Sequence, residues 1–120
     1  MSVDSKLNED MVRPWGFYRV IAQGKNYAVK ILHVNVGQKL SVQSHKYRSE
    51  HWVVASGKAQ ILLNDKTIIS EVGQSVDIPL GSIHSLQNPY NEDLEVLELQ
   101  MGEIISEDDI TRYSDIYGRA

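Results

Sequence analysis

The stretch LSVQSHKYRSEHWVVASG at residues 40–57 carries several side chains that can bind a metal ion or move a proton. Gln43, His45 and Glu50 stand among Val, Leu and Trp, and buried polar groups are unfavourable unless they are paired or metal-bound. Imidazole, carboxylate and amide oxygen are ligands of divalent cations such as zinc, iron, manganese or nickel. His84, at the start of a later apolar run, could supply the fourth ligand. These residue types suggest a metal site with room for water or a substrate.

A metal site of this kind requires that the ligands project from one face of neighbouring strands. Side chains alternate between the two faces of a strand, so Gln43 and His45 share a face. After the turn KYRS, Glu50 could point to the same side if the two strands pair inside a barrel. His51 falls on the face opposite Glu50 and is expected outside the ligand set. Taken alone, each His is more often a hydrogen-bonded core or surface residue than a ligand.

Short strands are the elements that would position these side chains. From residue 17 to residue 102 the sequence is a series of runs rich in Val, Ile, Leu or aromatic residues, each bounded by Gly, Asn, Asp or Pro. This pattern is typical of an all-β sandwich or barrel. NDK at residues 64–66 predicts a hairpin turn. Residues 1–11 are expected to form a flexible tail, and residues 12–120 a single domain.

Composition excludes several classes of protein. The chain has 120 residues and a net charge of −4, so it carries no basic footprint for nucleic acid. It has no apolar run of about 18 residues, so no membrane span is expected, and its polar start does not resemble a signal peptide. The absence of cysteine excludes disulfides and thiolate ligands and fits a cytoplasmic location.

Two sets of residues resemble the paired motifs of the cupin superfamily. The set that resembles the first motif is Gly37, Gln43, His45, Glu50 and Gly57. The set that resembles the second is Gly73, Pro79, Gly81, His84 and Asn88. The resemblance implies a small antiparallel β-barrel whose metal ligands are Gln43, His45, Glu50 and His84. Most cupins have His at the Gln43 position, and Gln there is similar to the metal site of phosphomannose isomerases.

The sequence between residues 12 and 119 resembles the type II mannose-6-phosphate isomerase domain. The segments that carry this resemblance are RPWG at 13–16, residues 40–59, IPLGSIHSLQNP at 78–89, LEVLELQMG at 94–102 and EDDITRYSDIYGR at 107–119. That domain is usually the C-terminal part of a bifunctional protein with mannose-1-phosphate guanylyltransferase, whose nucleotidyltransferase half this sequence lacks. The chain is therefore expected to be a stand-alone or an excised isomerase-like domain.

The resemblance implies an enzyme that interconverts mannose 6-phosphate and fructose 6-phosphate through a cis-enediol and supplies GDP-mannose for polysaccharide synthesis. It implies one divalent metal ion, zinc first, with cobalt, manganese, nickel or iron as alternatives. It also implies a homodimer that binds a small sugar phosphate, with a separate mannose-1-phosphate guanylyltransferase as a candidate partner. The alternative is a non-catalytic or differently specific metal-binding cupin, such as a sugar-binding protein, a nucleotide-sugar isomerase or a dioxygenase.

Arg48 and Glu98 are the candidate catalytic residues. Arg48 looks like the family's functional arginine and could hold a sugar oxygen or the phosphate, or it could instead form a salt bridge with Glu50 or Glu107. Glu98 is a candidate base, and the equal alternative is a buried partner for a metal-bound His or for Arg48. Arg13 is expected to pin the N-terminal strand.

The substrate contacts are expected at the mouth of the barrel. Lys30, Arg112 and Arg119 are candidate phosphate contacts, and a solvated surface role is open for each. The segment at 106–119 has a second interpretation, in which Ser106 caps a short C-terminal helix. That helix would pack on the barrel through the side chains of Tyr113, Ile116 and Tyr117.

The sequence departs from the family at a few positions. Lys46 and Tyr47 stand where the family often has His, and Ser85 stands where a basic residue often follows the second ligand histidine. Tyr47 is a candidate substrate contact, and Tyr47 and Ser85 are expected near the mouth of the pocket. These positions bear on substrate preference and on turnover.

Overall fold

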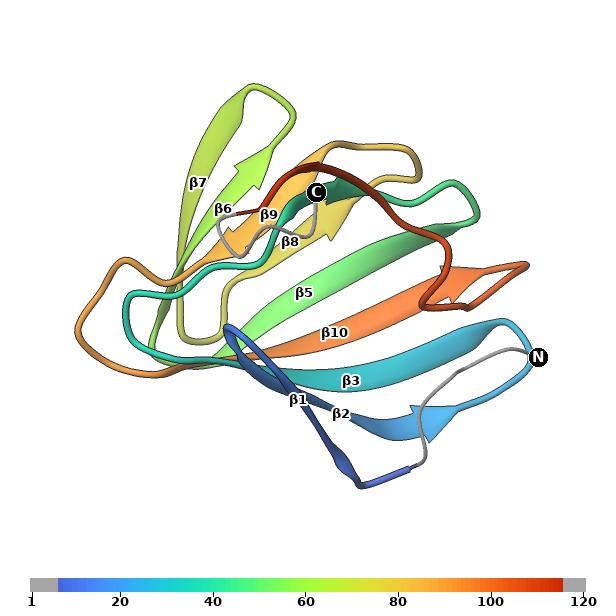
Figure 1. Cartoon of the computed structure of the whole chain (residues 1–120), viewed down its shortest axis with the longest axis horizontal. Coiled ribbons are helices and arrows are strands. Elements are labelled where there is room, and N and C mark those ends of the chain that lie inside the picture. Colours follow the sequence, from blue (N-terminus) through green and yellow to red (C-terminus); the bar gives the residue numbers. More distant parts are fainter. Residues whose placement is uncertain (1–6, 116–120) are drawn as a thin grey trace.

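The computed structural model describes residues 7–115 and shows two β-sheets that face each other (Figure 1). The strands are β1 (Asp10–Arg13), β2 (Gly16–Gln23), β3 (Tyr27–Val34), β4 (Val42–Ser44), β5 (Arg48–Ser56), β6 (Lys58–Leu63), β7 (Lys66–Glu71), β8 (Ser75–Ile78), β9 (His84–Gln87), β10 (Leu94–Gly102) and β11 (Thr111–Ser114). One sheet has the order β1-β2-β3-β10-β5-β8 and the other the order β11-β4-β9-β6-β7. The predicted all-β barrel is confirmed.

The inward-facing residues of β3, β10 and β5 are apolar towards one end of the barrel and mostly polar towards the other. Leu32, Val96 and Val54 are register partners in the apolar half of the interior, and all three are buried. The polar half is formed by Lys30, Glu98, Gln100, Glu50 and Arg48, which are also buried. Because antiparallel pairing places these polar positions side by side, the fold gathers its buried charges at one end of the barrel.

The hairpin between β6 and β7 agrees with its prediction. Asn64 and Asp65 form a two-residue turn, and Asn64 has a φ of +54°, a conformation that Asn tolerates well. In the part of the chain that the structure describes, no helix is long and apolar enough to cross a membrane.

Two local predictions differ from the structure. β1 begins at Asp10, inside the segment that was expected to be a tail, because Asp10–Arg13 pairs with β2. The predicted C-terminal helix is wrong over residues 106–115, which contain a turn followed by β11. The Ser106 hydroxyl does accept the Asp108 amide at 3.1 Å, but the chain then extends, because β11 pairs with the open edge of β4. The expected packing of Ile116 and Tyr117 lies outside the described residues.

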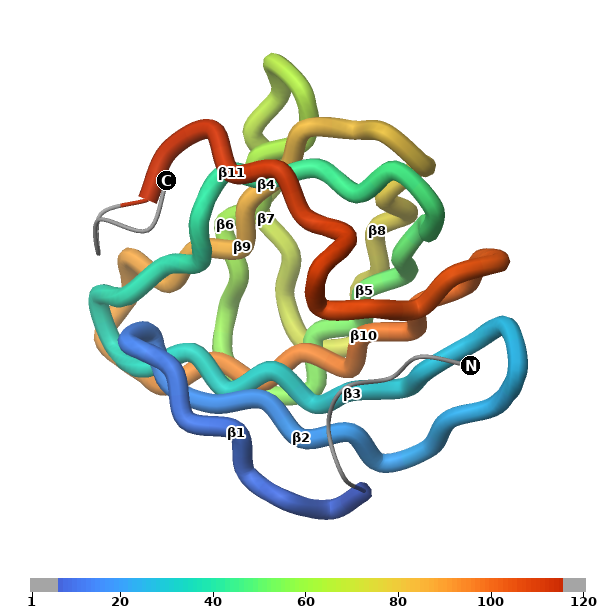
Figure 2. The backbone as a smooth tube through the Cα atoms, turned by 45° about the vertical axis from the view of Figure 1, so that its right-hand side comes forward, coloured from blue at the N-terminus to red at the C-terminus, as the bar shows by residue number. Residues whose placement is uncertain are grey.

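The segment from residue 103 to residue 110, called the crossing segment below, connects β10 to β11. Figure 2 shows it running back from the end of β10 in front of β5 and β10 towards β4. It therefore passes over the polar half of the barrel and can contact the residues there.

Candidate metal centre

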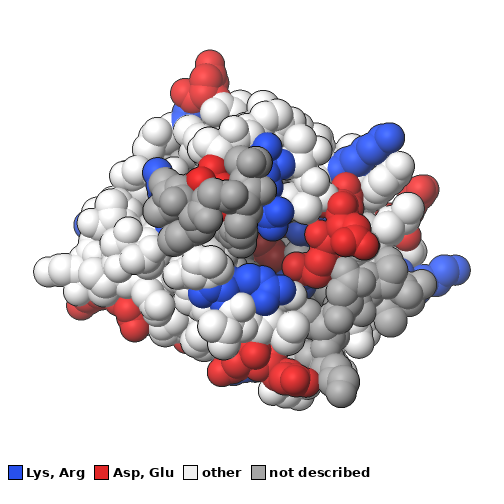
Figure 3. All heavy atoms as spheres, viewed as in Figure 1, with Lys and Arg blue, Asp and Glu red and all other residues white. Residues whose placement is uncertain are grey.

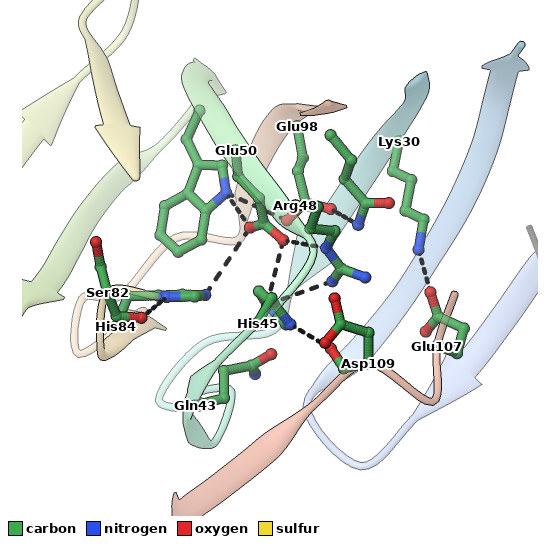
Figure 4. Close-up of polar contacts among 12 residues, drawn as sticks. Lys30, Gln43, His45, Arg48, Glu50, Ser82, His84, Glu98, Glu107 and Asp109 are labelled. Carbon is green, nitrogen blue, oxygen red and sulfur yellow. Dashed lines mark hydrogen bonds and ion pairs between the residues drawn. The ribbon is translucent and has the colours of Figure 1, made fainter. Parts of the chain in front are cut away.

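Three buried side chains meet in the polar half of the barrel. His45 follows β4, Glu50 lies in β5 and His84 begins β9, and each offers a ligand atom within 4.8 Å of the others (Figure 4). His45 Nε2 lies 3.2 Å from Glu50 Oε2, and His84 Nε2 lies 3.9 Å from Glu50 Oε1. Strand pairing thus brings together three of the four predicted ligands.

The protonation of the two imidazoles follows from their hydrogen bonds. His45 Nδ1 donates to the Asp109 carbonyl oxygen at 2.7 Å, and His84 Nδ1 donates to the Ser82 carbonyl oxygen at 3.0 Å. Carbonyl oxygens only accept, so each Nδ1 carries a proton. Burial lowers the pKa of both imidazoles, which favours the neutral form with a lone pair on Nε2.

The donor set fits a divalent cation. Two Nε2 lone pairs and one carboxylate face each other, and a shared cation would satisfy all three at once. Backbone carbonyls that accept from the remote Nδ1–H are the usual orienting partners of metal-bound imidazoles. His45, Glu50 and His84 could therefore hold one metal ion. Two nitrogens and one carboxylate suit zinc and several neighbouring transition metals, so the ligand types do not select one.

Arg48 keeps Glu50 ionised. Burial alone would raise the pKa of Glu50, but the positive charge of Arg48, the two neighbouring imidazoles and a hydrogen bond with Glu98 together hold that pKa well below its ordinary value. Arg48 Nε donates to Glu50 Oε2 at 2.9 Å, and its Nη2 donates to His45 Nε2 at 3.3 Å. A third bond reaches the Ser106 carbonyl oxygen of the crossing segment at 3.0 Å. The structure thus contains the alternative ion pair with Glu50, and a direct contact of Arg48 with substrate stays a prediction.

Glu98 is a second buried carboxyl group beside the first. The indole N–H of Trp52 donates to Glu50 Oε1 at 2.9 Å and to Glu98 Oε2 at 3.2 Å. Burial and then the negative charge of Glu50 raise the pKa of Glu98 to about 8. Gln100 Nε2 donates to Glu98 Oε1 at 2.7 Å, while Gln100 Oε1 is buried and finds no partner among residues 7–115. Two adjacent carboxyls with opposite pKa shifts are the arrangement that separates a charged role from a proton-carrying one.

A cavity connects these groups with solvent. Its lining residues include Arg13, Lys30, Arg48, Arg112, Glu50, Glu98, Glu107, Gln43, His84, Trp52 and Gln100. Figure 3 shows a hollow on this face with Lys and Arg side chains beside it and Asp and Glu side chains at one flank. The lining thus combines Gln43, Glu50 and His84 with cations that could hold an anionic group.

Three of the remaining predicted residues also line the cavity. Gln43 lies opposite His84 in the β4–β9 pairing, and its Nε2 donates to Ser41 Oγ at 3.1 Å. Its role as the fourth ligand stays a prediction. Lys30 is buried and ion-paired with Glu107, and Arg112 reaches the cavity from β11. Arg119 lies outside the described residues.

The structure does not bring the positions where the chain departs from its family into the cavity lining. Tyr47 is exposed, and its ring lies 5.3 Å from Lys46 Nζ at the surface. Ser85 is buried on the face opposite His84, where its hydroxyl donates to the Leu40 carbonyl oxygen at 2.9 Å. His51 lies outside the ligand set as predicted, with Nδ1 2.5 Å from Asp77 Oδ1.

Sequence reasoning missed the part of the site that the crossing segment supplies. The Asp109 carboxylate accepts the backbone amides of Lys46 at 2.8 Å and Tyr47 at 2.9 Å, while the Asp109 carbonyl holds His45. Arg13 was expected only to pin a strand, yet its side chain lines the cavity. Nothing local marks these roles, because the partners of Asp109 lie more than 60 residues away in the sequence.

Comparison with known proteins gives the relationships of the chain. It matches the family model described as mannose-6-phosphate isomerase C-terminal over residues 2–115. It is 44% identical to the alginate biosynthesis protein AlgA of Pseudomonas aeruginosa, over 92% of this chain and 23% of that protein. It is 41% identical to the mannose-1-phosphate guanylyltransferase ManC of Salmonella typhimurium, over 94% of this chain and 24% of that protein. The chain thus spans about a quarter of the length of these relatives.

Solved structures share the fold at low sequence identity. A double-stranded β-helix protein of Klebsiella pneumoniae matches with a TM-score of 0.71 and 16% identity, over 94% of this chain and 91% of that chain. The cupin domain of Schizosaccharomyces pombe Cnp3 matches with a TM-score of 0.69 and 15% identity, over 72% of this chain and 64% of that chain. The architecture is therefore the double-stranded β-helix of the cupins.

Proposed function

The chain belongs to the mannose-6-phosphate isomerase C-terminal family, and from this membership we propose that it is a metal-dependent isomerase of mannose 6-phosphate and fructose 6-phosphate. The observation that carries the proposal is the buried trio of His45, Glu50 and His84 at a cavity that also contains Glu98 and several cations. This combination offers a metal site, a proton carrier and an anion-binding region at one cavity.

Gln43, His45, Glu50 and His84 would hold the metal ion. When bound, the ion supplies positive charge that stabilises the oxyanion of an enediolate. Hydrogen bonds within the chain orient these ligands. Backbone carbonyls accept from both imidazoles, while Arg48 and Trp52 each donate to Glu50.

Glu98 is the residue we assign to proton transfer. In the forward direction the base takes the proton from carbon 2 of the aldose, and the carbonyl oxygen on carbon 1 gains a proton to give the cis-enediol. The base then delivers a proton to carbon 1, and the hydroxyl on carbon 2 loses its proton to become the ketone. A buried carboxyl with a pKa of about 8 can both accept and release a proton near neutral pH.

Other groups in the cavity suit a phosphorylated polyol. The unpaired Oε1 of Gln100 can accept a hydrogen bond from a sugar hydroxyl, which would satisfy a buried acceptor. Lys30 and Arg112 are assigned to the phosphate.

The names of the relatives connect them with mannose 1-phosphate and with alginate biosynthesis, and we propose that this chain supplies the same kind of precursor in the cytoplasm. We propose a homodimer, with a mannose-1-phosphate guanylyltransferase as its functional partner.

The test is a coupled isomerase assay on protein stripped of metal and reloaded with zinc, cobalt or manganese. We expect turnover of mannose 6-phosphate only after reloading. His84→Ala should lose the bound metal and the turnover together, whereas the matched control His51→Ala removes an imidazole outside the ligand set and should keep both. Elemental analysis of each variant measures the metal content.

Two outcomes would contradict the proposal. Metal-loaded protein that binds mannose 6-phosphate without converting it would be a sugar-binding cupin and not an isomerase. Equal metal content in His84→Ala and His51→Ala would show that the ligand assignment is wrong.

A further inference from the structure

Two cations lie against one aromatic ring in the lining of the cavity. Lys30 Nζ lies 4.6 Å from the centroid of the Tyr18 ring, and Arg13 Cζ lies 5.1 Å from the same centroid. Lys30 is buried on β3, and Arg13 comes from β1. The Tyr18 ring therefore attracts two positive charges from different strands, and all three residues line the cavity.

Glu107 supplies the anion that these cations face. Lys30 Nζ forms an ion pair with Glu107 Oε2 (Figure 4). Burial would raise the pKa of Glu107, but Lys30 lowers it, and Arg48 and Arg13 act in the same direction. The carboxylate thus lies in the combined field of three cations, which is where an anionic ligand would be most strongly attracted.

The spacing of the strands places this end of the cavity at a useful distance from the metal ligands. Lys30 is the register partner of Glu98, which is the register partner of Trp52 beside Glu50. Two inter-strand spacings separate β3 from β5, or about 10 Å. That separation suits an open hexose chain that has its first two carbons at the ligands and a terminal phosphate at Lys30.

We propose that Arg13 joins the phosphate contacts assigned above, next to Lys30, and that Glu107 occupies this subsite until the substrate arrives. The phosphate then takes the place of the Glu107 carboxylate as the partner of Lys30. The inference rests on the proposed function for the identity of the ligand, a phosphomonoester with about 1.5 to 2 negative charges. Such an ester carries more charge than the carboxylate it replaces, whereas an uncharged sugar cannot compete for Lys30. Glu107 therefore selects for phosphorylated sugars.

The exchange requires movement of one side chain only. The crossing segment is held by Arg48 at the Ser106 carbonyl and by His45 at the Asp109 carbonyl, so its backbone stays fixed on both sides of Glu107. The Glu107 side chain is 34% exposed and can turn towards solvent. Displacement of Glu107 thus leaves the metal ligands in place.

Calorimetric titration of the full chain with inorganic phosphate tests the subsite. Glu107→Gln removes the competing charge and should tighten phosphate binding about tenfold. Asp108→Asn is the matched control, because it makes the same charge change at an exposed neighbour. Arg13→Gln should weaken phosphate binding about tenfold, and Arg19→Gln, which removes the Arg19–Asp10 ion pair, should leave it unchanged.

Equal phosphate affinity in Glu107→Gln and Asp108→Asn, or weaker binding in Glu107→Gln, would overturn the proposal. Unchanged affinity in Arg13→Gln would overturn it as well, and this variant keeps the test open if Glu107→Gln does not fold. The titration does not depend on turnover. A protein that binds phosphate as expected without isomerising mannose 6-phosphate would refute the proposed function alone. Normal isomerisation together with unchanged phosphate affinity in Glu107→Gln and Arg13→Gln would refute the subsite alone.

Discussion

Glu50 and Glu98 are two carboxyl groups that share the indole N–H of Trp52 and differ in charge. Glu50 is held ionised against its burial by several groups, of which the guanidinium of Arg48 has the largest effect. Glu98 forms no ion pair with a cation among residues 7–115, so burial and the charge of Glu50 favour its protonated form. Glu50 is thereby suited to bind a cation, and Glu98, on the adjacent strand, is suited to carry a proton.

Glu98→Gln tests the proton-carrying role. The amide keeps the size of the side chain and cannot take a proton from carbon, so we expect turnover to fall about 10²- to 10⁴-fold. Metal content should be unchanged, because Glu98 is not one of the grouped ligands. The coupled assay and elemental analysis measure the two effects.

Glu95→Gln on the same strand is the control for this variant. Glu95 lies on the outer face of β10, where it contacts His33 at 2.9 Å, and its amide variant should keep full turnover. Wild-type turnover in Glu98→Gln would mean that another residue is the base. Loss of metal from Glu98→Gln would show instead that Glu98 acts by holding the ligands.

Asp109 provides three of the hydrogen bonds that attach the crossing segment to the barrel. The Asp109 carboxylate accepts two backbone amides of the turn before β5, and its carbonyl holds His45. Asp109→Ala removes two charge-assisted hydrogen bonds and should lower the free energy of unfolding by about 2–4 kcal/mol. Urea unfolding measures this change, and metal titration should show weaker binding, because His45 loses its fixed orientation.

Asp108→Ala is the control for that prediction. Asp108 is exposed, and its substitution should change the free energy of unfolding by less than about 0.5 kcal/mol. Equal destabilisation by the two substitutions would mean that the hydrogen bonds of Asp109 add nothing to the attachment of the crossing segment.

Local patterns predicted those elements whose partners are close in the sequence. Alternation along a strand put Gln43 and His45 on one face, and the Asn64–Asp65 turn followed from its residue types. β11 and the inward position of Arg13 could not be predicted in this way. β11 forms because the edge of β4 is open to it, and β4 lies more than 60 residues earlier in the chain. A capping serine and acidic residues suggested a helix there, and pairing with β4 outweighed that local preference.

The interior of the molecule has an apolar half that stabilises the fold and a polar half that contains the proposed site. The apolar half of the barrel packs Leu32, Val96 and Val54 among other aliphatic residues, while the polar half buries charged groups that the fold must stabilise. Buried groups with shifted pKa values make the free energy of unfolding depend on pH. Glu98 makes such a contribution.

In the metal-free protein the pKa of Glu98 rises from 4.5 to about 8 on folding. Between these values the folded state binds more protons than the unfolded state, so this group lowers the free energy of unfolding as pH rises. The slope for one proton reaches about 1.4 kcal/mol per pH unit. Glu50 acts oppositely, because its lowered pKa gives stability that is lost as pH falls below the ordinary range of a carboxyl. The depressed pKa values of His45 and His84 likewise favour the folded state as pH rises through 6.5.

Comparison of wild type with Glu98→Gln isolates the contribution of Glu98 from these opposing groups. Urea unfolding in the presence of a chelator at several pH values between 5 and 9 would give the difference in unfolding free energy. We expect the variant to gain stability relative to wild type as pH rises towards about 8 and the gain to level off above it, because in this range Glu98 of wild type ionises in the unfolded state and stays protonated in the folded state. Glu95→Gln, on the outer face, should show no such trend. A difference between Glu98→Gln and wild type that stays constant with pH would mean that Glu98 is already ionised in the folded protein, which would also remove the basis for its division of roles with Glu50.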